Sequence, residues 1–193
     1  MQFRLLYEGP IASWRYSDPA DKHRIRMYLH PQLKALWRYK PLLDIAHHLR
    51  ETTGPAGEIA ILERSNNVLF APLVTRKNHL ACELNITFLR QQPPGQLLGE
   101  GGDIDNRLKT LSDALRMPNK AEAQQAQIEA RPDDDPIHCL LQDDALVTKV
   151  SVETDRLLRH ANNRFDLVAI IQVRVLVSGT PTTGNYAFDA NVQ

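Results

Sequence analysis

Short apolar or alternating stretches, typical of β-strands, recur along this chain. They are residues 2–7, 59–62, 68–74, 81–89, 147–152 and 167–177. The alternation is clearest in the fourth stretch, where Cys82, Leu84, Ile86 and Phe88 fall on one side of an extended chain. The second and third stretches are separated by residues 65–67, a serine and two asparagines, which predict the turn of a hairpin.

Apolar residues at helical spacing indicate two helices. The first is predicted over residues 31–50, with Pro41 expected to break or kink it, because proline donates no backbone hydrogen bond. The second is predicted over residues 105–117. Its apolar residues form one buried stripe. They are Leu108, Leu111, Ala114 and Leu115.

Two segments fall outside these periodic patterns. Residues 118–137 are rich in alanine and glutamine and then acidic, so we expect an exposed insertion, formed by a short helix or a disordered excursion. Residues 178–193 are rich in glycine, threonine and asparagine and are expected to be a loose C-terminal tail. A chain of 193 residues suits one core of ordinary size, so we expect a single domain over residues 1–177.

The composition is that of an average soluble protein, with 42% apolar and 24% charged residues. No apolar run approaches the roughly 20 residues that a membrane span needs, and residues 1–7 lack the layout of a secretory signal. Cys82 and Cys139 are not part of a CxxC motif, so neither a zinc site nor a disulfide framework is indicated. We expect a cytoplasmic protein without a membrane partner.

The charges sum to zero but are unevenly distributed. Lys and Arg outnumber Asp and Glu by 13 to 8 over residues 1–92, and the balance reverses to 6 against 11 over residues 93–150. This asymmetry is either ordinary surface variation or a basic flank that binds phosphates beside an acidic centre. The candidate DNA-binding residues are Arg15, Lys22, Arg24, Arg26, Lys34, Arg38, Lys40 and Arg107.

Two acidic pairs are the candidate chemistry. Asp103 and Asp105 lie two residues apart where a glycine-containing loop meets the second predicted helix, and an extended segment would point both side chains the same way. Two such carboxylates can share Mg²⁺, which prefers oxygen ligands. Lys109 follows one helical turn after Asp105. A second pair, residues 143–144, precedes a predicted strand.

Each of these residues also has a purely structural interpretation. Asp105 could cap the helix, and Asp113 could be the ion-pair partner of Lys109 four residues earlier. An isolated DxD is common in turns. The combined string, DxDN followed by lysine and then Asp-Ala-Leu, is much rarer than its parts.

This combination resembles the RusA family of Holliday junction resolvases. The family motif is DxDN entering a helix with a lysine and then Asp-Ala-Leu, completed downstream by Asp-Asp-Ala-x-Val; here these are residues 103–115 and 143–147. The resemblance implies that Asp103, Asp105 and Asp144 hold the metal and that Lys109 joins them in catalysis. It also implies a small α/β (α+β) fold, a mixed sheet packed by two main helices, that forms a homodimer.

The implied activity is Mg²⁺-dependent hydrolysis of phosphodiesters in four-way or branched DNA, in recombination and repair, with Mn²⁺ as a substitute metal. Two alternatives stay open. One is a catalytically inactive protein of the same fold that binds branched DNA. The other is a metal-dependent nuclease or phosphoesterase that acts on other substrates, such as single strands or nucleotides.

Overall fold

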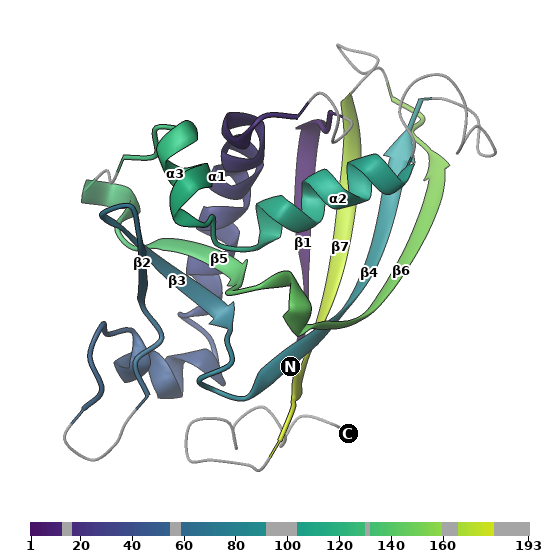
Figure 1. The fold of residues 1–193 in the computed structure, drawn as a ribbon. Helices are drawn as coiled ribbons and strands as arrows, with labels where there is room; N and C mark the ends of the chain where they lie inside the picture. The colour runs from purple at the N-terminus through teal and green to yellow at the C-terminus, as the bar shows by residue number, and fades with distance from the viewer. Residues whose placement is uncertain (13–16, 55–58, 92–103, 130–131, 160–165, 180–193) are drawn as a thin grey trace.

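The computed structural model of the chain describes residues 1–12, 17–54, 59–91, 104–129, 132–159 and 166–179. Within these ranges the chain forms two mixed β-sheets and several helices, which confirms the expected α+β class (Figure 1). The sequence predicted one sheet, and the second sheet was not predicted. Most of the predicted tail, residues 180–193, lies outside the described ranges.

The main sheet has four strands in the order β1-β7-β4-β6. They are β1 (Gln2–Pro10), β7 (Asp166–Val177), β4 (Leu80–Arg90) and β6 (Val147–Arg156). β4 pairs antiparallel with β7 and parallel with β6. Leu84 of β4 lies opposite Val173 of β7, and both are buried. Their neighbours Glu83 and Arg174 lie on the other face of the sheet, as the predicted alternation requires.

The second sheet has three strands in the order β2-β3-β5. They are β2 (Glu63–Ser65), β3 (Val68–Val74) and β5 (Ile137–Leu141). Asn66 and Asn67 join β2 to β3 with φ angles of 47° and 65°, a left-handed conformation that asparagine tolerates better than most residues. The predicted turn and its second strand are therefore confirmed, but the first strand is β2 at residues 63–65 and not the predicted 59–62. β5, which runs parallel to β3, was not predicted.

Helix α1 (Pro19–Leu36) lies beside the edge strand β1. Asp18 caps its N-terminus, because the Asp18 carboxylate accepts a hydrogen bond of 2.7 Å from the backbone N–H of Asp21. The side-chain amide of Gln32 accepts from the backbone N–H of Leu6 at 2.9 Å and donates to its carbonyl at 2.7 Å. Gln32 thus satisfies part of a strand edge that would otherwise be open to another strand.

The first predicted helix was misplaced at its start. The structure begins α1 at Pro19 and keeps Pro31 inside it. The apolar pattern of its first half is weak because Arg26 and His30 lie on its buried side together with leucine and isoleucine. The expected interruption at Pro41 is confirmed, since α1 ends at Leu36 and a separate 3-10 helix, η2 (Leu42–His48), follows.

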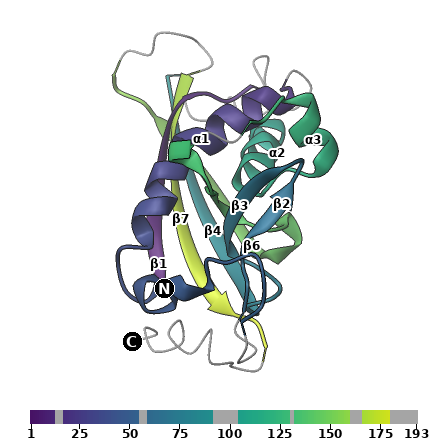
Figure 2. The same cartoon turned by 90° about the vertical axis from the view of Figure 1, so that its left-hand side faces the viewer.

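Helix α2 (Ile104–Leu115) packs across the main sheet on the side of its buried side chains. Leu111, Ala114 and Leu115 of the predicted stripe are buried, and Leu108 is half-buried. In the turned view of Figure 2, α2 and α3 (Lys120–Gln125) lie on the same side of the main-sheet strands as β2 and β3. None of the helices in the described ranges has the length and apolar character to cross a membrane.

The segment expected to be an exposed insertion is packed into the fold. Asn119 and Glu122 form a capping box at the start of α3, with reciprocal hydrogen bonds of 2.9 Å. Ala123 and Ile128 are 0% and 5% exposed, and they join Phe70 of β3 in a small second core. Two buried apolar residues suffice for this anchoring, and they were too few to produce a visible periodic pattern.

Candidate functional site

The outer side of α2 carries two of the predicted catalytic residues. Asp105 lies in its first turn and Lys109 one turn later, and both are exposed. The opposite side of the helix is fixed in the fold: the Thr110 hydroxyl donates to the carbonyls of Ala12 and Asn106, each at 3.1 Å. Asp105 and Lys109 are therefore displayed by a well-packed element.

The downstream acidic pair is divided between a structural and an exposed residue. Asp143 caps the short helix η4 (Asp144–Leu146): its carboxylate accepts a bond of 2.8 Å from the N–H of Ala145 and lies 3.3 Å from the Arg76 guanidinium. The Ala145 N–H is the largest of the causes that lower the pKa of Asp143. Asp144 is exposed. This division supports Asp144 as the residue of the pair that is available to a ligand.

Asp144 lines two neighbouring hollows. One hollow, of about 330 Å³, lies between α2, the main sheet and η4. It is lined by Leu84, Ser112, Leu141, Asp144, Ala145, Val147 and Val150. The other, of about 400 Å³, lies beside the chain that follows α2 and includes Arg116, Asn119 and Gln142 in its lining. A polymeric ligand that passed over Asp144 would therefore meet a hollow on each side of this residue.

The separation between Asp105 and Asp144 decides whether both residues can bind the same metal ion. Asp144 lies beside Ser112, and Ser112 follows Asp105 by seven residues, or about 10 Å at 1.5 Å per residue. Magnesium–oxygen bonds are only about 2 Å long, so a shared ion requires the carboxylates of Asp105 and Asp144 to converge on one point. Asp103 lies outside the described residues, and the described part of the chain contains no group of three or more His, Cys, Asp or Glu side chains arranged for a metal.

The donor chemistry nevertheless fits a hard cation. Asp105 and Asp144 both offer exposed carboxylates, the ligand type that Mg²⁺ prefers. Each sits at the start of a helical turn, Asp105 on α2 and Asp144 on η4. The described geometry thus supplies two separate carboxylates along one side of α2.

Asp113 has a structural role instead of facing Lys109. Its carboxylate accepts from Lys22 Nζ of α1 at 2.6 Å, and Arg116 approaches it at 3.3 Å. Arg26 is 3% exposed and donates to the backbone carbonyls of Arg116 and Asp113 at 2.9 and 3.0 Å, where α2 ends. These contacts join α1 to the C-terminal turn of α2.

The prediction of DNA binding is corrected for three residues, because their side chains are largely buried. Lys22 is occupied by Asp113, with only 13% of its side chain exposed, and Arg26 is buried. Arg107 is 2% exposed, and burial, with a smaller contribution from Arg90, lowers its pKa to about 10. Lys22 and Arg26 join α1 to α2, and the burial of all three side chains in this structure keeps their charged groups from a phosphate backbone.

The other expected DNA-binding residues are divided along the molecule. Arg24 is exposed and paired with Asp21 at 2.8 Å, while Arg38 and Lys40 are exposed beyond the end of α1. Lys34 is partly buried, and Arg15 lies outside the described residues. Of the described members of the set, Arg24, Arg38 and Lys40 are therefore the ones with exposed side chains.

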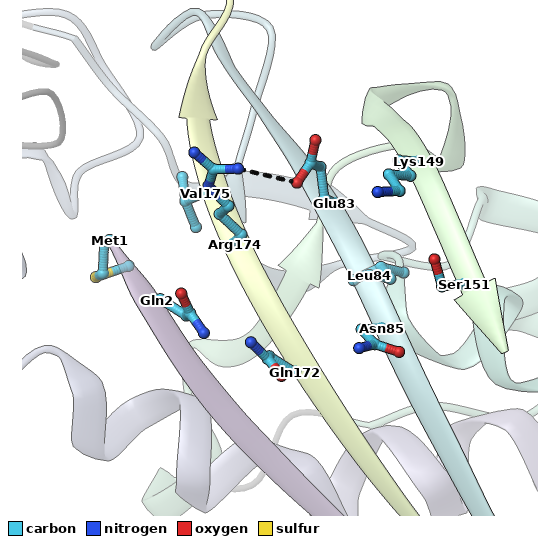
Figure 3. A pocket seen from close by; sticks show the side chains of 10 residues that line it. All are labelled: Met1, Gln2, Glu83, Leu84, Asn85, Lys149, Ser151, Gln172, Arg174 and Val175. Carbon is cyan, nitrogen blue, oxygen red and sulfur yellow. Dashed lines mark hydrogen bonds and ion pairs between the residues drawn. The ribbon is translucent and has the colours of Figure 1, made fainter. Parts of the chain in front are cut away.

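A polar hollow on the open face of the main sheet was not anticipated. It has a volume of about 540 Å³ and is lined by amide and hydroxyl side chains that include Asn85, Ser151 and Gln172 (Figure 3). Arg174 pairs with Glu83 across this face at 3.4 Å. The polar positions that alternate with the buried ones in β4, β6 and β7 were the sequence signal that could have revealed it.

Comparisons with known proteins give no further assignment: no family model, curated protein or solved structure matches this chain.

Proposed function

We propose that this protein is a Mg²⁺-dependent endodeoxyribonuclease that cuts four-way or other branched DNA, as its resemblance to the RusA family implies. The observation that carries the proposal is the division of roles among the motif acids. Asp105 and Asp144 are exposed beside α2, whereas Asp113 and Asp143 are occupied by an ion pair and a helix cap. Motif residues with exposed side chains are the ones available to a substrate.

In this proposal Asp105 and Asp144, together with Asp103, hold the metal. Bound Mg²⁺, or Mn²⁺ in its place, would stabilise negative charge on the phosphoryl oxygens and acidify a water molecule. Because Asp144 lines a hollow with Ser112, two helical turns after Asp105, the proposal assigns Asp103, or movement of η4 toward the start of α2, to complete one metal site.

Lys109 provides the positive charge on this side of α2. Its ammonium group is one helical turn from Asp105, so a phosphate held near Asp105 comes within its range. Charge that develops on the phosphate in the transition state would be stabilised there. The carboxylates alone repel DNA, so binding of the metal and of the substrate should strengthen each other.

The test is a cleavage assay on a mobile four-way junction, a flap, a linear duplex and a single strand, each with and without Mg²⁺. The proposal predicts Mg²⁺-dependent cleavage with a preference for the branched substrates. Equal cleavage of the linear or single-stranded DNA would favour a general metal nuclease. Junction binding without cleavage at any Mg²⁺ or Mn²⁺ concentration would favour an inactive relative and contradict the enzymatic assignment.

A further inference from the structure

Two histidines are buried where α1 meets β5. His30 of α1 and His138 of β5 are each 4% exposed, and their ring centroids lie 5.6 Å apart. Trp37 lies against His138 at 6.2 Å between centroids and closes the group on one side. Neither histidine is among the residues to which the proposed chemistry is assigned.

The hydrogen bond between the two histidines fixes the protonation state of His30. The backbone N–H of His138 donates to Nδ1 of His30 at 2.8 Å. Nδ1 must therefore carry a lone pair, and the proton of the neutral ring resides on Nε2. Nε2 lies 3.8 Å from the Asp134 carboxylate in η3 (Pro132–Asp134). One neutral imidazole thus connects α1 to both η3 and β5.

His138 is also held in its neutral form. Its Nδ1 is buried and has no hydrogen-bond partner among the described residues, so a proton there would bring an unsolvated charge. The ionisable groups that act on the pair are Asp134 from η3, Lys34 from α1 and the two histidines themselves. Of the two charged groups, Asp134 favours protonation of His30, and Lys34 opposes protonation of both rings.

We propose that His30 and His138 form a proton-sensitive joint that holds α1 against β5 while both rings are neutral and loosens when either ring is protonated. A proton on Nδ1 of His30 would remove the lone pair that accepts the hydrogen bond from the His138 N–H. A charged His138 would need water or a counter-ion that the packed site does not provide. Because β5 leads directly into Asp143 and Asp144, loosening it would also release the exposed acidic turn η4.

The direction of the pH effect follows from proton linkage. Burial lowers the pKa of His30, and burial with the nearby His30 lowers the pKa of His138 to about 3. In the unfolded chain both would titrate near 6.5. Between these values the unfolded chain binds more protons than the folded protein, so stability is full above about pH 6.5 and is lost as the pH falls.

The test is the unfolding equilibrium of the full chain in denaturant from pH 7.5 to 4.5. Each neutral histidine should make the unfolding constant rise by up to about tenfold per pH unit below 6.5. His30→Gln retains an acceptor oxygen for the His138 N–H, and His138→Phe retains a buried ring; neither titrates. Because each variant removes one histidine, the slope of its unfolding free energy against pH should decrease by the equivalent of about one bound proton. The control His47→Gln, at an exposed histidine, should retain the wild-type slope.

A second measurement keeps the proposal testable if a variant does not fold. In the wild-type protein the His138 amide should be protected from hydrogen exchange at neutral pH and lose protection at acid pH before the amides of β4 and β7. Histidine NMR should show no protonation of folded His30 near pH 6.5. Titration of folded His30 near 6.5 with the His138 amide still protected would overturn the proposal, as would wild-type pH dependence in both variants.

Discussion

Neighbouring acids in this chain have different structural roles. Asp113 accepts the Lys22 ammonium at 2.6 Å, and Asp143 caps η4, but Asp105 and Asp144 are exposed. The motif in the sequence identifies all four as one group. Only the packing of α1 against α2 and the geometry of η4 distinguish those that hold the fold together from those that can meet a ligand.

Replacing Asp105 with asparagine is predicted to abolish cleavage and to leave junction binding intact or stronger. The change removes a metal ligand and one negative charge that faces the phosphates, while the side chain keeps its size. Cleavage rate and junction affinity should be measured together, with Glu153→Gln, an exposed acid on β6, as the matched control. Wild-type turnover by Asp105→Asn would remove Asp105 from the site.

Lys109→Ala is predicted to lower the cleavage rate by about 10²-fold with little change in DNA affinity. An interaction made chiefly in the transition state affects the rate constant and not the ground-state complex. Single-turnover rates and equilibrium binding to the same junction separate the two effects. If affinity falls as much as the rate, Lys109 is an ordinary phosphate contact.

At the scale of elements, segments with a strong apolar periodicity were predicted correctly. Segments without such a periodicity were missed or misplaced. The alternation in β4 and the stripe of α2 were visible because most of their buried positions are apolar. The start of α1 was missed because Arg26 and His30 occupy buried positions, and β5 was missed because a five-residue strand buried throughout shows no alternation. The interiors of these elements depend on hydrogen bonds that no single-sequence pattern records.

The segment around α3 gives a test of element packing. Ile128→Ala should lower the free energy of unfolding by about 2–4 kcal/mol, because Ile128 is 5% exposed in the second core beside Phe70. Glu129→Ala, at the exposed neighbouring residue, should have little effect. Urea unfolding of both variants measures the difference. Equal stability of the two would restore the earlier prediction of an exposed insertion.

At the scale of the whole molecule, the inward-facing apolar residues of α1 and β7 are used within the monomer. Leu33 and Trp37 are buried in the main core, as are the inward-facing residues of β7. The dimer itself stays a prediction, because two nicks related by the two-fold axis of a junction call for two copies of one site. Its interface must lie on another surface.

Light scattering at micromolar concentration tests the homodimer. The predicted mass is twice 21.9 kDa for the protein alone, and the complex with a four-way junction should contain two protein chains per junction. A mass that stays near 21.9 kDa for the protein alone, and that corresponds to one protein per junction in the complex, would contradict a coordinated pair of nicks.

The central claim is tested most directly by single-turnover cleavage of a mobile four-way junction as Mg²⁺ is titrated. Wild-type protein and Glu153→Gln should cut with the same saturating dependence on Mg²⁺, and Asp144→Asn should remain folded, bind the junction and fail to cut. Cleavage by Asp144→Asn at the wild-type rate, or wild-type cleavage that persists when Mg²⁺ is chelated, would contradict the account.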